Sequence, residues 1–240
     1  MKIIETRELT KRFGGLIAVN RVSMHVAEGE IVGLIGPNGA GKTTFLNAIA
    51  GLDPPSSGSV FFMNRETTGL PPERMCHLGL ARTFQIPRPF PKMTAFHNVL
   101  TAAYFGNLPA PVPDPEAHAR EKLDFVEFPM PEDTVCENLN TLQLKRLDLA
   151  RALASNPKLI LLDELAAGLT FGELNDLMAI IRKIRDRGTT IMLVEHIVQV
   201  IMGLCDRLVV IQFGNKIADG PTQDVVKDPI VETAYLGADF

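Results

Sequence analysis

The 240-residue chain contains no tryptophan, only two tyrosines and only three cysteines. Cys76, Cys136 and Cys205 are widely spaced and odd in number, so they supply neither a disulfide framework nor the Cys-x-x-Cys pairs of a zinc site. We therefore expect three buried free thiols in a protein that works in a reducing compartment.

A strong charge of either sign is also missing. The chain has 24 lysines and arginines against 28 aspartates and glutamates, which gives a formal net charge of −4. A protein that binds nucleic acid through its phosphates needs a basic surface, so this balance argues against nucleic acid as a partner.

Long hydrophobic runs are absent as well. No stretch reaches the ~18 apolar residues that span a bilayer, and residues 1–5 lack the apolar block of a signal peptide. We expect a chain that is soluble by itself. If it acts at a membrane, other chains must supply the membrane spans.

The sequence does contain short, fully apolar runs at residues 31–35, 159–162 and 191–194. Such runs are typical of central strands that are covered on both faces. A helical pattern from Leu174 to Ile184 separates the last two runs, and Gly188 stands where a helix cap belongs. Strand, helix and strand in this order predict a parallel βαβ unit.

Antiparallel structure is expected near both ends of the chain. Residues 3–8 and 18–26, with Gly14-Gly15 between them, favour a pair of N-terminal antiparallel strands. A second hairpin is predicted around Gly214-Asn215, between apolar residues on both sides.

The middle of the chain is rich in proline. Residues 116–155 then return to a helical pattern, so residues 86–155 are predicted to form an inserted helical subdomain. Residues 1–85 and 156–240 would form the core of one domain that spans 1–240. The four prolines expected in an exposed loop are Pro109, Pro111, Pro113 and Pro115.

One motif predicts a phosphate-binding loop. Residues 36–43 match G-x-x-x-x-G-K-[ST] in full, after a predicted strand and before a helical pattern that ends at Gly51. The glycines let main-chain N–H groups surround a phosphate, the Lys42 ammonium would bind the β- and γ-phosphates, and the Thr43 hydroxyl would ligate Mg²⁺. The predicted nucleotide-binding residues here are Gly36, Pro37, Asn38, Gly39, Ala40, Gly41, Lys42, Thr43 and Thr44.

A pair of acids follows the second apolar run. Asp163 and Glu164 stand at the carboxyl end of a predicted parallel strand, which is where ligands bind in such sheets. Asp163 is predicted to hold Mg²⁺, directly or through water. Glu164, one residue further on, is predicted to act as the general base on the attacking water.

Two more residues are candidates at the same edge. His196 follows the third apolar run, so we expect it to contact the γ-phosphate. Gln85 stands where the core gives way to the proline-rich insertion. Its amide could orient water or Mg²⁺ and report the nucleotide state to the helical part.

With these motifs in place, almost the whole chain resembles the nucleotide-binding subunit of an ABC transporter. In that family Gly36–Thr43 corresponds to the Walker A loop, Gln85 to the Q-loop residue and His196 to the switch histidine. The segment 11–16 resembles the one whose aromatic residue, here Phe13, stacks on adenine. Residues 159–164 correspond to Walker B with the catalytic glutamate, and 167–170 to the D-loop.

Finer details look most like the subunits that serve uptake of branched-chain or hydrophobic amino acids. The stretches that carry this likeness are Arg82–Gln85, Asp163–Thr170 and Ala234–Gly237. The substrate assignment is an analogy, because function resides in sites and in other subunits rather than in the fold.

The family signature, LSGGQ or an LTLGE-like variant, is altered in this chain. Asn140 replaces a hydroxyl residue and Leu142 replaces a glycine, although Asn140 is still a good N-cap for the helix that follows. In this family the signature covers the γ-phosphate bound by the partner subunit, so we expect that contact to be weakened. A heterodimer with an intact partner would then keep one good site, on this chain. The signature residues are Leu139, Asn140, Thr141, Leu142 and Gln143.

The resemblance implies an α/β P-loop NTPase fold with a mainly parallel sheet, an N-terminal antiparallel part and the helical insertion. It implies an ATPase that uses ATP and Mg²⁺ and energises an importer. Its partners would be a second ABC ATPase subunit, membrane permease subunits and, indirectly, a solute-binding protein, at the cytoplasmic face of the cell membrane.

Two alternatives stay open: a soluble ABC ATPase acting on nucleic acid or ribosomes, and a regulatory subunit with weak hydrolysis. A GTPase switch is disfavoured, because residues 215–218 read NKIA and lack the acid of NKxD.

Overall fold

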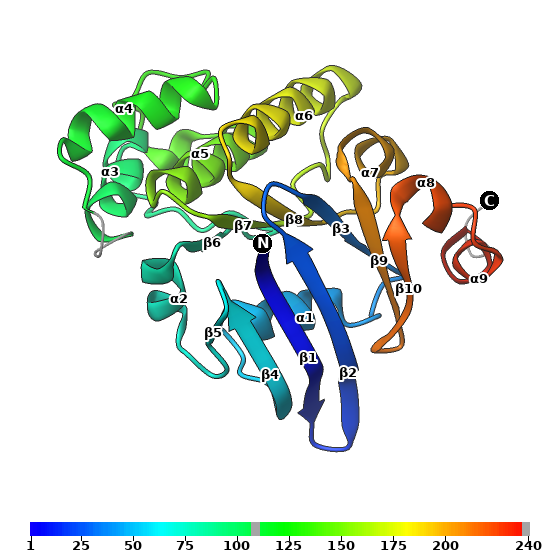
Figure 1. The fold of residues 1–240 in the computed structure, drawn as a ribbon. Helices are drawn as coiled ribbons and strands as arrows, with labels where there is room; N and C mark the ends of the chain where they lie inside the picture. Colours follow the sequence, from blue (N-terminus) through cyan, green and yellow to red (C-terminus); the bar gives the residue numbers. More distant parts are fainter. Residues whose placement is uncertain (107–110, 237–240) are drawn as a thin grey trace.

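The computed structural model describes residues 1–106 and 111–236 (Figure 1). Its centre is a six-stranded sheet in the order β10-β9-β3-β8-β7-β6, in which only β9 and β10 pair antiparallel. The mainly parallel sheet predicted from the apolar runs is therefore confirmed. Its strands are β3 (Ile31–Ile35), β6 (Leu80–Arg82), β7 (Leu159–Asp163), β8 (Thr190–Val194), β9 (Arg207–Gln212) and β10 (Asn215–Pro221).

A second, four-stranded antiparallel sheet has the order β2-β1-β4-β5. Gly14 and Gly15 connect its first two strands, as the sequence predicts, and Gly14 takes a positive φ of 57°. The last two strands were not predicted. The strands are β1 (Lys2–Phe13), β2 (Leu16–Ala27), β4 (Ser57–Phe62) and β5 (Arg65–Glu66).

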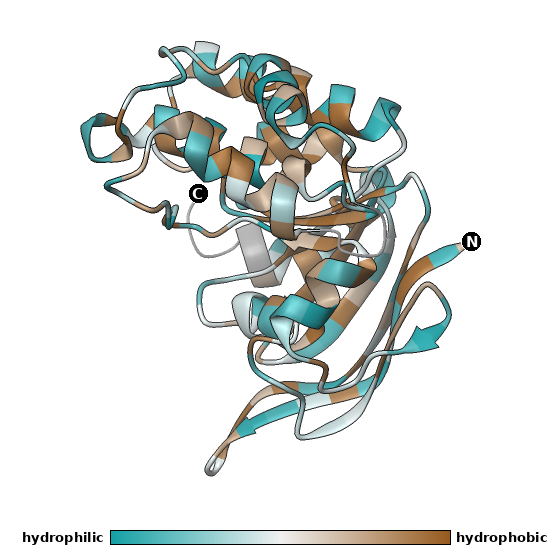
Figure 2. Cartoon of the chain, turned by 90° about the vertical axis from the view of Figure 1, so that its left-hand side faces the viewer, coloured by the Kyte–Doolittle hydropathy of each residue, from teal (hydrophilic) through white to brown (hydrophobic). Residues whose placement is uncertain are grey.

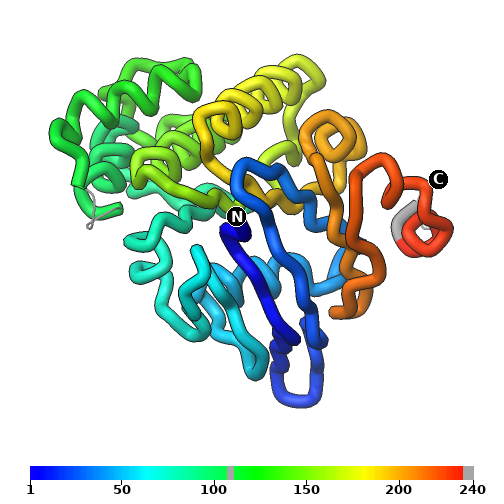
Figure 3. Tube along the Cα trace, in the orientation of Figure 1, coloured from blue at the N-terminus to red at the C-terminus, as the bar shows by residue number. Residues whose placement is uncertain are grey.

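The helices lie around these sheets, and the three between 95 and 154 pack on one another at one end of the molecule (Figures 1 and 3). The C-terminal segment lies at the opposite end. The α-helices are α1 (Lys42–Ile49), α2 (Pro72–Leu78), α3 (Ala95–Phe105), α4 (Pro115–Phe125), α5 (Thr141–Ala154), α6 (Phe171–Asp186), α7 (Val198–Leu204), α8 (Thr222–Val225) and α9 (Pro229–Val231), with single-turn elements η1 (Cys136–Asn138) and η2 (Glu232–Leu236).

The parallel strands separate two hydrophobic cores. Ile160 and Leu162 of β7 face the core formed with α3–α7, whereas Leu159 and Leu161 face the core formed with α1 and the antiparallel sheet. Every residue of β7 is buried, because side chains alternate between two covered faces. Figure 2 shows these strands as brown segments inside the molecule.

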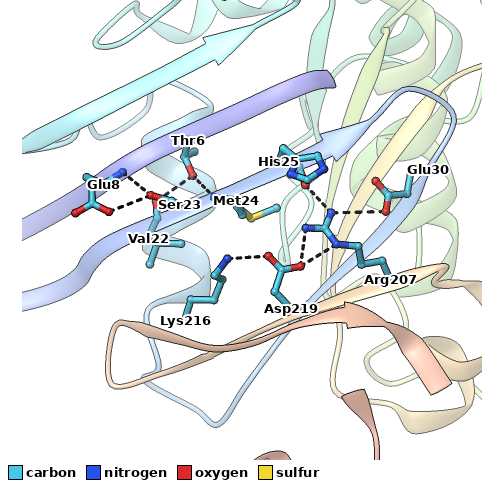
Figure 4. A network of polar contacts seen from close by, with 10 residues as sticks. All are labelled: Thr6, Glu8, Val22, Ser23, Met24, His25, Glu30, Arg207, Lys216 and Asp219. Atoms are coloured by element: carbon cyan, nitrogen blue, oxygen red, sulfur yellow. Dashed lines mark hydrogen bonds and ion pairs between the residues drawn. The ribbon is translucent and has the colours of Figure 1, made fainter. Parts of the chain in front are cut away.

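Arg207 at the start of β9 ties the two sheets together (Figure 4). Its guanidinium donates to the His25 carbonyl of β2 at 2.8 Å and, through Nε, to Asp219 of β10 at 2.8 Å. Glu30 lies 3.6 Å from the same guanidinium. This cluster links the two sheets beside β3, the strand that leads into the predicted phosphate loop.

Several predictions need correction. The C-terminal hairpin turns at Phe213-Gly214, with φ of 47° and 77°, and Asn215 already belongs to β10. Pro115 is the first residue of α4, where its fixed φ suits a helix start, and so lies outside the predicted loop. The predictions for Pro109 and Gly237 fall outside the described residues.

The structure also bears on the predictions for the cysteines and for membrane-spanning helices. All three cysteines are free; Cys136 and Cys205 are buried as predicted, and Cys76 is half-buried. Burial raises the pKa of the Cys205 thiol to about 12, which disfavours the thiolate form. In residues 1–106 and 111–236, no helix has both the length and the apolar character needed to span a bilayer.

Candidate functional site

The predicted phosphate loop follows β3, and its last two residues, Lys42 and Thr43, are the first residues of α1. Gly36 has a φ of 147°, and a Cβ there would overlap the Ile211 carbonyl of β9. Gly41 has a φ of 103°, and a Cβ there would overlap the Ala18 carbonyl of β2. Both positions therefore require glycine, because of backbone conformation and of close approach.

The loop is also held from the C-terminal hairpin. Gly214 donates its N–H to the Ala40 carbonyl at 2.9 Å, and its own carbonyl accepts from the Asn20 N–H at 2.8 Å. Parts of the chain that are far apart in sequence therefore fix the loop on both sides.

Lys42 points its ammonium into the loop. Its Nζ donates to the carbonyls of Gly36 at 2.7 Å and Pro37 at 3.0 Å, and the residue is only 7% exposed. Burial lowers the pKa of Lys42, while the nearby charges of Glu164 and Asp163 act in the opposite direction. A buried ammonium beside a glycine-rich loop is suited to bind phosphate oxygens.

A cavity of about 440 Å³ opens on this loop, which is a usual size for a small-molecule site. It is lined by residues 38–44, by Glu164 and by the aromatic ring of Phe13, which is 48% exposed at the end of β1. Phe13 therefore lines the cavity of the phosphate loop, and its stacking on adenine stays a prediction. Phe213, at the hairpin turn and 80% exposed, lines the same cavity and was not predicted.

Asp163 lies at the carboxyl end of β7, buried and 3% exposed. Its Oδ2 accepts from the Arg82 guanidinium at 2.9 Å, and both side chains of this ion pair are almost inaccessible to solvent. Arg82 also donates to Asn47 Oδ1 of α1 at 2.5 Å. The sequence showed Arg82 only as part of a family stretch and gave no sign of this pairing.

Glu164 and Gln85 meet directly. The Gln85 Nε2 donates to the Glu164 Oε2 at 2.5 Å, which joins the start of the helical insertion to the predicted general base. Glu164 has a φ of 48°, a conformation that costs energy for a residue other than glycine. Strain of this kind persists where surrounding contacts determine the backbone, which often happens at functional sites.

His196 is exposed and follows β8 by two residues. Since β8 lies between β3 and β7, His196 is at the same sheet edge as the phosphate loop and Asp163, as predicted. Its contact with a γ-phosphate stays a prediction.

The altered signature begins α5. Asn140 is the N-cap, its Oδ1 accepts the Gln143 N–H at 3.0 Å, and Gln143 Oε1 accepts the Asn140 N–H at 2.9 Å. The predicted N-cap is therefore confirmed, and the reciprocal bond of a capping box is added. Thr141 is exposed and Leu142 is half-buried at the first turn, while Leu139 is buried.

The residues predicted to ligate Mg²⁺ come together. Thr43, Gln85 and Asp163 line one cavity at the end of α1 and β7. Arg82 donates to Oδ2 of Asp163 and lines the same cavity. Oxygen donors of this kind, few in number, suit an ion that shares its coordination with phosphates and water. No group of three His, Cys, Asp or Glu residues suited to a metal is found in the described part of the chain.

The phosphate loop leads from β3 into α1, and the acidic pair Asp163 and Glu164 lies at the end of β7, two strands away in the same sheet. This arrangement defines a P-loop ATPase. The chain belongs to the ABC transporter family, whose sequence model matches residues 19–167. It is thus an ATP-binding, ATP-hydrolysing subunit of the transporter type, as the family resemblance predicts.

Known proteins are similar over nearly the full length. The high-affinity branched-chain amino acid transport ATP-binding protein BraF of Pseudomonas aeruginosa is 39% identical, over 98% of this chain and 98% of its own. The probable branched-chain amino acid transport ATP-binding protein LivG of Archaeoglobus fulgidus is 36% identical, over 99% and 96%.

Solved structures agree with the fold. The ADP conformation of an ATP-binding cassette of an ABC transporter has a TM-score of 0.88 and 31% identity, over 99% of both chains. A cassette bound to ADP and phosphate, described as dimeric, has a TM-score of 0.82 and 27% identity, over 91% of this chain and 98% of its own.

Proposed function

We propose that this ATPase energises the import of branched-chain or other hydrophobic amino acids. The observation that carries the substrate is the full-length similarity to two relatives named for branched-chain amino acid transport, one bacterial and one archaeal. Both share more than a third of their residues with this chain, over at least 96% of their own length.

In this proposal Lys42 exchanges its two carbonyl partners for oxygens of the β- and γ-phosphates. The N–H groups of residues 38–43 and the N-terminus of α1 bind the remaining phosphate oxygens. Phe13 stacks on the base, because its exposed ring lies on the wall of the same cavity. Positioning and electrostatic stabilisation would supply most of the catalysis, as in other phosphoryl transfers.

Glu164 acts as the general base on a water aligned with the γ-phosphate, and His196 contacts that phosphate from the neighbouring strand end. In the present conformation the Gln85 amide occupies one oxygen of Glu164. Release of this bond frees the carboxylate to accept a proton from water.

Mg²⁺ fits at Thr43, Gln85 and Asp163, where it would neutralise developing charge on the phosphates. Arg82, which lines the same cavity, binds one carboxylate oxygen of Asp163 and would thereby orient that carboxylate for the ion.

The proposed assembly has two ATPase subunits, identical or not, in which Leu139–Gln143 of one covers the ATP of the other. The dimeric cassette among the structural relatives supports this arrangement. Permease subunits would dock beside Gln85, and a solute-binding protein would deliver the amino acid. The chain would then lie at the cytoplasmic face of the membrane without crossing it.

The test is reconstitution of the complex with permease and binding-protein subunits encoded next to this chain, in vesicles loaded with MgATP. Leucine uptake is expected, with glutamate as a matched polar control, and Glu164→Gln should abolish it. ATP-dependent uptake that does not distinguish leucine from glutamate, or no uptake from an ATP-hydrolysing complex, would refute the substrate assignment.

A further inference from the structure

The segment after Glu164, residues 165–167, is held by a buried lysine from a different part of the chain. Lys145 lies on α5, two residues after the altered signature, and is only 4% exposed. Its Nζ donates to the carbonyl of Leu165 at 2.7 Å and to that of Ala167 at 2.5 Å. One ammonium therefore binds two carbonyls of the same short segment.

The same segment is held from the other side by Glu195, the residue before His196. Glu195 is also 4% exposed, and its Oε1 accepts the Ala166 N–H at 2.8 Å. Burial raises the pKa of Glu195, and its Oε2 has no hydrogen-bond partner among the described residues. A buried carboxylate with one bond to a backbone N–H is costly, so its retention calls for a gain elsewhere.

The two side chains thus bind one backbone group on each of three consecutive residues: the carbonyl of Leu165, the N–H of Ala166 and the carbonyl of Ala167. These groups follow directly after Glu164, whose φ of 48° is strained. Its own N–H is bonded to the Val194 carbonyl at 3.0 Å. Bonds at Glu164 and directly after it therefore oppose relaxation of its backbone to an ordinary conformation.

We propose that Lys145 and Glu195 are positioning residues for the ATPase reaction: together they fix residues 165–167 and thereby aim the Glu164 carboxylate at the attacking water. Neither residue touches the nucleotide cavity. They act through the backbone, and they join the helix that begins at the signature, the loop after β7 and the loop that carries His196 into one unit.

Lys145 and the next residue, Arg146, contact different parts of the molecule. Arg146 is also buried, but its guanidinium donates to the carbonyls of Val126 and Glu127, after α4. Arg146 also lies 3.8 Å from Asp176 of α6, but among the described residues it makes no hydrogen bond to residues 165–167, whereas Lys145 bonds that segment directly. This contrast supplies a matched control.

The first test measures hydrogen–deuterium exchange in the full-length, nucleotide-free protein. Lys145→Met keeps most of the side-chain length and removes the donors, whereas Lys145→Arg keeps donors and charge. Glu195→Leu and Glu195→Gln form the corresponding pair for the acceptor. Exchange in peptides covering 164–168 should rise about tenfold or more in the Met and Leu variants and stay near the original rate in the Arg and Gln variants. Arg146→Met should leave these peptides unchanged.

The second test separates turnover from binding. The Met and Leu variants should lower kcat by about tenfold to a hundredfold, since a misplacement near 1 Å can cost ~10²-fold, while the KM for ATP changes by less than about threefold. The Arg and Gln variants should recover most of kcat. Lys145→Met combined with Glu195→Leu should lose less than the product of the two single effects, because both act on one segment.

The proposal is overturned if exchange in 164–168 does not change in either the Met or the Leu variant, or if kcat stays within about twofold of the unmodified enzyme. It is also overturned if the conservative variants lose as much as the disruptive ones, or if KM and kcat change together. Should Lys145→Met fail to fold, the Glu195 pair still decides the outcome, because Glu195→Gln preserves shape and the bond to Ala166.

Discussion

Replacing Arg82 with methionine will leave a buried carboxylate without its cation. The Arg82–Asp163 pair spans 2.9 Å, and its two side chains are 6% and 4% exposed. Removal of one partner from such a pair typically costs about 3–5 kcal/mol, because the remaining charge stays buried and uncompensated. We expect Arg82→Met to lower the free energy of unfolding by that amount.

A surface ion pair gives the matched control. Lys183 and Glu127 are 2.7 Å apart, closer than the buried pair, yet their side chains are 55% and 51% exposed. Because solvent screens such a pair, Lys183→Met should cost only about 0–1 kcal/mol. The comparison separates the effect of burial from that of distance, because the exposed pair is the closer one and yet is expected to contribute less to the free energy of unfolding.

The assay is urea unfolding of the nucleotide-free protein. The chain has no tryptophan, so far-ultraviolet circular dichroism is the suitable signal. Midpoint and slope together give the change in unfolding free energy. A double variant, Arg82→Met with Asp163→Asn, should recover part of the loss, because no unpaired charge remains. Equal losses for Arg82→Met and Lys183→Met, or no recovery in the double variant, would refute the reasoning.

Four further predictions concern the site and its surroundings. Lys42→Ala should weaken MgATP binding about tenfold or more in calorimetry, because a charge-assisted contact is lost; unchanged affinity would contradict the assignment of the phosphate loop. Glu164→Gln should bind ATP with near-normal affinity and hydrolyse it at least about a hundredfold more slowly, and turnover at the original rate would exclude it as the base. Leu142→Gly should raise the ATPase rate of the isolated chain, and no rise would remove the argument that the altered signature weakens the partner site. Burial raises the pKa of Asp148 above 3.8, so the folded protein holds its proton more tightly than the unfolded chain. The protonated Asp148 carboxyl group contributes stability that is fully present below pH 3.8 and is lost as the pH rises through the pKa of Asp148 in the folded protein. Asp148→Asn should therefore stabilise the protein at pH 8 and flatten the pH dependence of the urea midpoint above pH 4; an equal pH dependence would contradict this.

The parts of the site that lie in continuous stretches could be predicted from the sequence. The phosphate loop is set by glycines and a lysine within eight residues, and Asp163 and Glu164 end a recognisable apolar strand. Asn140 as an N-cap follows from local hydrogen bonding. In each case the physical cause acts over a few neighbouring residues.

Contacts between distant segments could not be predicted in this way. Arg82 meets Asp163, and Gln85 meets Glu164, across about 80 residues of intervening sequence. The contact of Lys145 with residues 165–167 likewise joins segments 20 residues apart, and no local pattern indicates it. The C-terminal turn was placed one residue late, because Gly-Asn and Phe-Gly both permit a two-residue hairpin, and pairing of β9 with β10 decides between them.

The packing of Gly36 against the carbonyl of Ile211 has a consequence for synthesis of the protein. The glycine loop emerges early from the ribosome, but the strand and hairpin that brace it are translated about 175 residues later, roughly 10–35 s at usual rates of synthesis. Until then the nascent chain lacks the wall of its own nucleotide pocket. A polypeptide truncated before β9 should therefore fail to retain ATP, even though every residue of the glycine loop is present.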